Sequence, residues 1–354
     1  MAYSSITKPS DYFQTKLYTG NGTAIGSGGL SVTLDETMTP NFIWLKNRTT
    51  SNSNSHQLYD TIRGVTKGLK ANSADAENTN SERLTNFNSN GFTVGNNGDV
   101  NTNGTTYVAW NWKAGTSFTN DASGTGIGSI DSAGSFNNTS GFSICTFTGT
   151  GSAGTIKHGL NTVPTMIIVK GRNEAKAWTV YHSALGAGKA LFLATAAGAT
   201  TSTAYFGGTT PTSSVFSTGS STNVSGNNIT FVAYCFADVQ GYSKMGSYKG
   251  NGNANGTFVY TGFSPAFLMI KQTAASNDWF MIDNKREPFN PNNVQLVANG
   301  TSASTNKGDL DLLSNGFKPK SSNAAWNENN AEYIYMAFAE NPFVASNYNA
   351  ATAR

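Results

Sequence analysis

Short runs of aromatic and β-branched residues alternate along the chain with clusters of glycine, asparagine, serine and threonine. This alternation is typical of many short strands joined by turns. Apolar residues at the i, i+3, i+4, i+7 spacing of an amphipathic helix are almost absent. The pattern therefore predicts an all-β fold.

One aromatic hexapeptide pattern occurs three times, as YVAWNW from Tyr107, FVAYCF from Phe231 and YIYMAF from Tyr333. Successive side chains of a strand point to opposite faces of its sheet. The first copy is therefore expected to present alternate residues on its two faces. These sets are Val108, Trp110 and Trp112 on one face, and Tyr107, Ala109 and Asn111 on the other.

A second block begins with proline and also occurs three times. The copies are TPNFIWLKNR, VPTMIIVKGR and SPAFLMIKQT, and their proline–lysine pairs are Pro40 and Lys46, Pro164 and Lys170, and Pro265 and Lys271. From each lysine to the last aromatic residue of the following hexapeptide the chain advances 66, 66 and 67 positions. Such a constant register predicts three tandem repeats in which the hexapeptide is the closing strand.

Each repeat, of about 100 residues, is expected to be a two-layer β-sandwich or jelly-roll-like unit. The near-continuous apolar runs IWL and MIIV predict a central strand that is covered on both faces. We expect the first repeat to be freer than the other two, since a Gly/Ser/Asn-rich segment follows it. The expected divisions are an N-terminal arm (1–16), repeat 1 (17–114), a linker (115–141), repeat 2 (142–240), repeat 3 (241–343) and a C-terminal tail (344–354).

Composition narrows the classes of partner. Charged residues make up 12% of the chain, and the formal net charge of +3 is spread without a basic block. This distribution implies neither nucleic acid nor an anionic membrane as a partner. Because we find no signal-peptide-like segment and no long apolar run, we expect a protein that is made in the cytoplasm and stays soluble.

Cysteine and histidine give no support for a cofactor or metal site. Cys145 and Cys235 are too few for a disulfide framework and are expected to be buried free thiols, with a disulfide between them as the alternative. The three histidines, His56, His158 and His182, have no metal-ligand spacing and are expected to be structural. We therefore expect no cofactor and no bound metal.

An acid stands three residues before an arginine in two of the three repeats. These pairs are Asp60 with Arg63 and Asp283 with Arg286, whereas His182 occupies the corresponding place in repeat 2. Since one copy lacks the pair, we expect structural ion pairs that close a turn rather than catalytic dyads. The pattern predicts no catalytic residue, although two carboxylates far apart in the sequence, as glycoside hydrolysis requires, remain an open alternative.

The six tryptophans suggest either core packing or stacking on sugar rings. Five lie in predicted strands and are expected in the core: Trp44, Trp110, Trp112, Trp178 and Trp279. Trp326 lies in the polar segment SSNAAWNENNAE, outside any predicted strand. It is the candidate for an exposed contact with a glycan or receptor, and the alternative is a loop anchor folded onto a sheet.

Several long segments carry a resemblance to a known family. They are PSDYFQTKLYTGNG, YVAWNWKAG, FVAYCFADVQGYSKMGSYKGNG and YIYMAFAENPF. Together they resemble repetitive β-rich virion proteins of tailed bacteriophages that infect marine and freshwater bacteria, cyanophages among them. The resemblance extends from about residue 8 to residue 343. It implies a non-enzymatic tail-fibre subunit or receptor-binding module, assembled in the host cytoplasm and located in the virion.

The resemblance also implies other virion proteins and host-surface polysaccharide as partners, and a homo-oligomer. Two alternatives remain at this point. One is a capsid decoration or head-fibre protein, anchored by the N-terminal arm or by the tail ASNYNAATAR. The other is a polysaccharide depolymerase, which is supported only by the long loops and the tryptophans.

Overall fold

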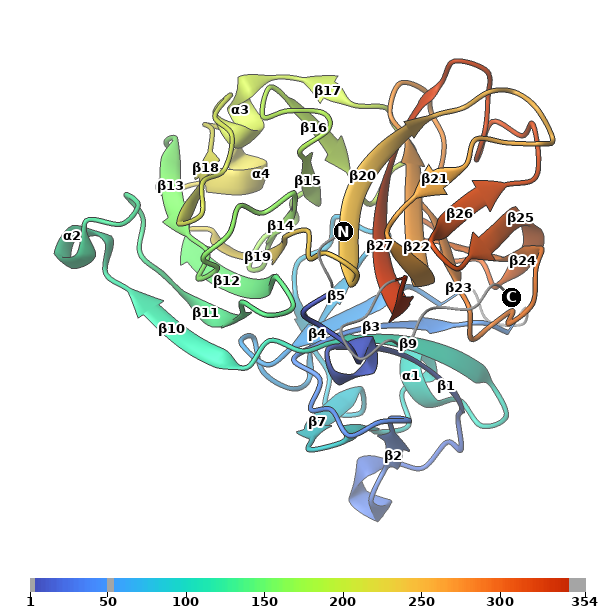
Figure 1. Ribbon diagram of the computed structural model, residues 1–354. Helices are drawn as coiled ribbons and strands as arrows, with labels where there is room; N and C mark the ends of the chain where they lie inside the picture. Colours follow the sequence, from blue (N-terminus) through green and yellow to red (C-terminus); the bar gives the residue numbers. More distant parts are fainter. Residues whose placement is uncertain (1–3, 50–53, 344–354) are drawn as a thin grey trace.

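The structure is a computed structural model and describes residues 4–49 and 54–343 (Figure 1). Strands account for 44% of these residues and helices for 7%, so the predicted all-β class is confirmed. The strands form several antiparallel sheets, three of which contain the hexapeptide strands. We call these three the first, second and third sheets.

The first sheet has six strands and is faced by a smaller sheet of three. In spatial order the first sheet contains β1 (Phe13–Thr19), β9 (Thr106–Trp112), β3 (Phe42–Asn47), β4 (Gln57–Asp60), β5 (Lys67–Lys70) and β6 (Asn78–Thr79). The smaller sheet contains β2 (Leu30–Thr33), β8 (Gly91–Val94) and β7 (Leu84–Asn88). Apolar side chains from both sheets meet in one buried cluster between them.

The second sheet has eight strands. In spatial order they are β10 (Thr116–Asn120), β11 (Ser132–Asn137), β12 (Phe142–Thr148), β19 (Thr230–Phe236), β14 (Met166–Gly171), β15 (Thr179–His182), β16 (Lys189–Phe192) and β17 (Thr200–Thr201). A separate pair lies beside it and consists of β13 (Gly154–Lys157) and β18 (Val215–Thr218).

The third sheet also has eight strands, and it curls into a nearly closed barrel. In spatial order they are β20 (Ser243–Lys249), β27 (Glu332–Pro342), β22 (Phe263–Gln272), β23 (Phe280–Asp283), β24 (Asn292–Val297), β25 (Thr305–Leu313), β26 (Gly316–Pro319) and β21 (Val259–Tyr260). The first and last strands of this order, β20 and β21, are neighbours in the sequence.

Helices are short and connect strands. They are η1 (Pro9–Asp11), η2 (Ile25–Ser27), α1 (Gly98–Asn101), α2 (Ala122–Thr125), α3 (Thr203–Phe206) and α4 (Thr222–Ser225). Each α-helix starts after a residue whose side-chain oxygen accepts a backbone N–H of the first turn. These capping residues are Asn97, Asp121, Ser202 and Ser221.

The same strand order occurs in all three sheets. Each hexapeptide strand pairs on one side with the strand that opens its segment and on the other with the proline-led strand. The orders are β1-β9-β3-β4-β5, β12-β19-β14-β15-β16 and β20-β27-β22-β23-β24. Figure 1 shows the three sheets around a common centre, the first in blue to teal, the second in green to yellow and the third in orange to red.

One large apolar cluster, the central core, contains side chains from all three sheets. The predicted alternation explains this arrangement. Val108, Trp110 and Trp112 point into the central core, whereas Tyr107 and Ala109 point into the cluster between the first sheet and its smaller partner. The proline-led strands are buried on both faces, as their continuous apolar runs predict.

The last aromatic residues of the three hexapeptides meet inside the central core. The ring centroid of Trp112 lies 6.3 Å from that of Phe236 and 5.6 Å from that of Phe338, and the last two are 6.0 Å apart. Edge-on contacts at this spacing are favourable between aromatic rings. The expectation that the first repeat is freer than the others is therefore wrong, because Trp112 of the first sheet contacts both other rings.

Residues 115–141 also differ from the expected linker. They contain β10 and β11, which add two strands to the second sheet beside β12. The rings of Phe118 and Phe136 contact each other with their centroids 6.0 Å apart, and both pack against the apolar cluster of that sheet. Two aromatic residues at strand spacing therefore outweigh the Gly/Ser-rich composition.

The expected terminal segments are placed differently. The N-terminal arm (1–16) overlaps the fold, because β1 begins at Phe13 and pairs with β9. Ser4 donates to the backbone carbonyl oxygens of Ile6 and Gln240, so the described part of the arm is attached to the fold. The expected C-terminal tail (344–354) lies outside the described residues.

Replacing Trp112 by alanine should destabilise the whole protein. The substitution leaves a large void where three sheets meet, and such truncations of buried tryptophan cost about 3–5 kcal/mol. The measurement is urea unfolding followed by fluorescence and circular dichroism, and both signals should shift together in one transition. Phe289→Ala is the control, because Phe289 is 73% exposed and its loss should change stability by less than about 0.5 kcal/mol.

Candidate functional site

Buried polar side chains join the three sheets to one another. A ring nitrogen next to the start of β4, β15 and β23 bonds in each case to the last carbonyl of a strand in another sheet. The pairs are His56 with Val297 at 3.0 Å, Trp178 with Lys70 at 2.8 Å and Trp279 with Phe192 at 3.1 Å. In the order given, these bonds run from the first sheet to the third, from the second to the first and from the third to the second, so each sheet is joined to both others.

The tautomer of His56 follows from its partners. Trp44 Nε1 donates to His56 Nδ1 at 2.8 Å, so Nδ1 carries no proton. The proton is therefore on Nε2, which donates to the carbonyl of Val297. Burial lowers the pKa of His56 well below its usual range, which keeps the ring neutral.

Both acid–arginine pairs form buried ion pairs. Arg63 Nε lies 2.5 Å from Asp60 Oδ2, and Arg286 Nε lies 2.6 Å from Asp283 Oδ2. In each pair the other carboxylate oxygen accepts the arginine's own backbone N–H, which closes the turn. The aspartates also accept a bond from another sheet, since Tyr234 Oη donates to Asp60 at 2.7 Å and Trp110 Nε1 donates to Asp283 at 3.1 Å.

This contact explains why His182 replaces the acid in the second sheet. The residue of β27 that matches Trp110 and Tyr234 is Met336, whose thioether has no proton to donate. A buried carboxylate would lack that partner here. His182 Nδ1 instead accepts the backbone N–H of Ala184, and Nε2 donates to the carbonyl of Tyr335 in the third sheet at 3.3 Å.

Three buried lysines also cross between sheets. Lys46 Nζ donates to the carbonyl of Thr301, Lys170 Nζ to that of Ala74 and Lys271 Nζ to that of Ala196. Burial lowers the pKa of each of these lysines to about 8. The sequence marks them by their fixed distance from proline, although that signal does not reveal that they join neighbouring sheets.

The two cysteines are buried and form no disulfide. Cys145 lies on β12 and Cys235 on β19. Burial raises the pKa of Cys235 to about 12 and that of Cys145 well above its usual range. Both thiols are therefore protonated at neutral pH and unreactive.

Trp326 is fully buried, which corrects the expectation of an exposed contact with a glycan. Its ring packs against Phe280 of β23 at 4.8 Å, within the apolar cluster of the third sheet. The polar residues around it in the sequence form turns over the cluster, and the indole anchors them. Of the two alternatives for this residue, the loop anchor is therefore the one that matches its position.

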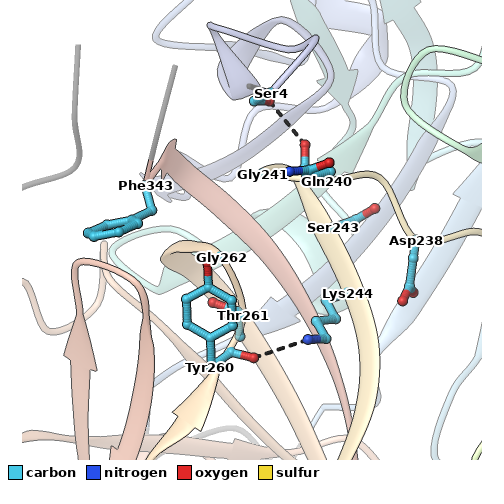
Figure 2. A pocket seen from close by; sticks show the side chains of 10 residues that line it. All are labelled: Ser4, Asp238, Gln240, Gly241, Ser243, Lys244, Tyr260, Thr261, Gly262 and Phe343. Carbon is cyan, nitrogen blue, oxygen red and sulfur yellow. Dashed lines mark hydrogen bonds between the residues drawn. The ribbon is translucent and has the colours of Figure 1, made fainter. Parts of the chain in front are cut away.

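A cavity of about 480 Å³ lies where the connection between the second and third sheets meets the end of β21, and we call it the Tyr260 cavity (Figure 2). The residues used below are Asp238, Ser243, Lys244, Tyr260, Thr261 and Phe343. Figure 2 shows the rings of Tyr260 and Phe343 on one side and the carboxylate of Asp238 on the other, while the ammonium end of Lys244 points towards Tyr260. The cavity thus has an aromatic side and a polar side.

Tyr260 supplies an exposed aromatic surface. Tyr260 is 48% exposed, whereas most of the described aromatic residues are buried. Lys244 Nζ donates to the backbone carbonyl of Tyr260 at 3.2 Å and lies 5.8 Å from the centre of its ring. The lysine therefore positions the tyrosine by a hydrogen bond and a cation–π contact.

Asp238 supplies a carboxylate on the opposite side. Its Oδ1 accepts the Thr165 hydroxyl and the backbone N–H of Met245, each at 2.8 Å. Although the residue itself is exposed, neighbouring groups partly desolvate its carboxyl, which raises the pKa of Asp238. The two bonds to Oδ1 orient the carboxylate.

An aromatic face beside hydroxyl, carboxylate and ammonium groups can bind a ligand that has both apolar and hydroxyl-bearing surfaces. In the part of the chain that the structure describes, no three histidine, cysteine or acidic side chains gather as metal ligands. Among residues 4–49 and 54–343, no helix has the length and apolarity needed to span a membrane.

The fold and this cavity define the chain as an all-β protein built on three joined sheets with a polar, aromatic-sided cavity at one junction. Residues 8–342 match the model of a family described as a domain of unknown function (DUF7483), and the chain belongs to that family. Searches of curated proteins and of solved structures found no match.

Replacing Asp60 by asparagine should destabilise the protein by about 3–5 kcal/mol, because the buried Arg63 guanidinium would lose its fully buried counter-charge and keep only Glu77, whose side chain is partly exposed. Urea unfolding at neutral pH measures the effect. Asp75→Asn is the matched control, because Asp75 pairs with Lys70 at the surface and should cost at most about 1 kcal/mol. Equal losses in the two variants would show that burial of the Asp60 pair does not matter.

The histidines predict a loss of stability in mild acid. Burial lowers the pKa of His158 and of His182 to about 4. Between about pH 6.5 and pH 4 the unfolded chain therefore binds protons that the folded chain does not, so stability falls as pH falls through this range, by roughly 1.4 kcal/mol per pH unit for each group.

Urea unfolding between about pH 6 and pH 5 measures this slope. In His182→Gln, which keeps a side-chain donor towards Tyr335, the slope should be shallower by roughly 1 kcal/mol per pH unit. An unchanged slope would mean that His182 is charged in the folded protein.

Proposed function

We propose that the chain is a non-enzymatic virion structural protein of a tailed bacteriophage, a tail-fibre subunit or receptor-binding module that contacts host-surface glycan. The segments that resemble virion proteins extend over the same part of the chain as the three joined sheets. The protein functions within the virion, after assembly in the cytoplasm of the bacterial host. Its partners are other virion proteins, further copies of itself and host-surface polysaccharide.

The proposal includes three tandem repeats, each a two-layer β-sandwich-like unit. The common strand order of the three sheets supports this description, and so do the matched contacts that run from sheet to sheet. Repeats whose faces close on one central core give a rigid body. Such a body suits a part of a particle that must keep its shape while its outer loops make contact.

The observation that carries the glycan contact is the Tyr260 cavity. It combines an exposed aromatic ring with oriented polar groups on a rigid framework. A pyranose presents an apolar C–H face to an aromatic ring and hydroxyl groups to its surroundings, so both sides of the cavity find a complement. Individual contacts of this kind are weak, and several copies on one particle would add avidity.

The histidines and inter-sheet lysines have structural partners, which supports a non-enzymatic role. Each histidine accepts a backbone N–H on Nδ1 or, in His56, the indole N–H of Trp44. Their pKa values are lowered by burial, so they would not exchange protons readily at neutral pH. The residues best suited to acid–base chemistry are therefore engaged in holding the fold.

Tyr260→Ala should weaken binding of the purified protein to host-surface polysaccharide at least tenfold, which corresponds to about 1.4 kcal/mol. Surface plasmon resonance with immobilised capsular polysaccharide or lipopolysaccharide measures the affinity. Phe289→Ala is the matched control, because it removes an exposed aromatic ring that does not line the cavity. Equal affinity of Tyr260→Ala and the unaltered protein would refute the role of the cavity.

Cryo-electron microscopy of the particle tests the virion role separately. Density for the chain at the tail periphery supports a fibre or receptor-binding module. Density over the capsid lattice would instead make it a decoration protein, and absence from the particle would overturn the proposal. Release of oligosaccharides from host polysaccharide by the purified protein would favour a depolymerase.

A further inference from the structure

We propose that a second cavity, between the first and third sheets, binds one neutral, hydroxyl-rich sugar residue. This cavity has a volume of about 270 Å³, and we call it the Asn284 cavity. The residues that carry the argument are Phe13, Thr15, Asp35, Glu36, Asn284 and Lys285. The inference does not depend on the virion role proposed above.

Asn284 is the strongest indication of a ligand. It directly follows β23, lines the cavity and is only 2% exposed. Neither its Nδ2 nor its Oδ1 has a hydrogen-bonding partner among the described residues. A buried amide without partners is unfavourable to the folded state and rare in native proteins. A ligand that both accepts and donates hydrogen bonds would satisfy this amide.

A second buried polar residue lines the same cavity. Thr15 of β1 is 5% exposed, lines the cavity, and its hydroxyl has no partner in the described part of the chain. The donors and acceptors therefore come from two different sheets. A molecule bound between them would be held by both.

The fold itself does not require an asparagine at position 284. Thr61 follows Asp60 in the first sheet as Asn284 follows Asp283 in the third. The hydroxyl of Thr61 is partnered, because Asn41 Nδ2 lies 3.3 Å from it. The unsatisfied amide is thus particular to this junction and is not part of the contact pattern that the sheets share.

The ion pairs of Asp35 and Glu36, two of the acidic residues at the cavity, favour a neutral ligand. Asp35 Oδ1 lies 2.6 Å from Lys16 Nζ, and Asp35 Oδ2 lies 3.3 Å from Lys285 Nζ. Glu36 Oε2 lies 2.8 Å from Lys8 Nζ. Since ammonium groups already neutralise these carboxylates, a divalent cation would have to displace them. Hydroxyl groups can bond to the same oxygens without separating the ion pairs.

The volume and lining of the cavity suit one sugar ring. A water molecule occupies about 30 Å³ in the liquid, so the volume holds a ring-sized molecule. Phe13, Ala266 and Ala339 give one part of the wall an apolar surface. The ring of Phe13 is held in place by stacking on Phe338 at 5.0 Å. The C–H face of a pyranose matches this wall, and its hydroxyl groups match Asn284 and Thr15.

The test uses the methyl glycosides of glucose, galactose, mannose, rhamnose and N-acetylglucosamine. Saturation-transfer NMR with the full chain should detect at least one of them. Asn284→Leu should weaken that binding at least tenfold while leaving the melting temperature of the ligand-free protein unchanged or higher, because an apolar side chain of similar size replaces an unsatisfied amide. Thr15→Val should likewise weaken binding of that glycoside.

Two control variants make the outcomes distinct. Asn327→Leu makes the same change at a buried asparagine whose amide is fully bonded, so it should lower the melting temperature. Tyr260→Ala should leave binding at the Asn284 cavity intact. Binding that is lost in Tyr260→Ala and retained in Asn284→Leu would overturn the inference, as would binding of none of the five glycosides. Saturable binding of calcium ions that Asn284→Leu abolishes would overturn the choice of ligand.

Discussion

The contact of Trp112, Phe236 and Phe338 is the constraint on which the rest of the structure depends. Each ring is the last aromatic residue of one hexapeptide strand, and the three lie within 6.3 Å of one another in pairs. To bring them together, the three sheets must turn the same face inwards. That orientation fixes the alternation of every neighbouring strand. The opposite faces of the first and second sheets are covered by the smaller sheets and loops, and that of the third sheet by its own strands β25, β26 and β21.

Three sheets that meet at one centre leave polar backbone groups at their junctions, and the chain satisfies these with a small set of side chains. Ring nitrogens and lysine ammonium groups reach from one sheet to the carbonyls of the next. Burial favours their uncharged forms, which is why the histidines are neutral and the lysines have lowered pKa values. The presence of His182 in place of an aspartate has the same cause. The facing strand β27 has Met336 at the position where β9 and β19 have the hydrogen-bond donors Trp110 and Tyr234.

The two cavities lie where this regular pattern ends. Tyr260 stands at the end of β21, an edge strand of the third sheet. It remains exposed, whereas the other tyrosines in the strands of that sheet, Tyr248, Tyr333 and Tyr335, are buried. Asn284 occupies a position whose counterpart Thr61 is satisfied within the protein. Binding groups on a framework that is held rigid by its core are already ordered before a ligand arrives, so less conformational entropy is lost on binding.

The sequence by itself determined the β class, the alternating faces of the hexapeptide strands and the burial of five tryptophans, because strand periodicity and side-chain hydrophobicity act locally. It also indicated the Asp60–Arg63 and Asp283–Arg286 pairs, whose partners are three residues apart. Only the tertiary structure decided that residues 115–141 extend a sheet, that Trp326 is covered, and that Tyr260 and Asn284 line cavities. Exposure and hydrogen-bond satisfaction at these positions depend on segments far away in the sequence, which meet only when the three sheets close on their common core.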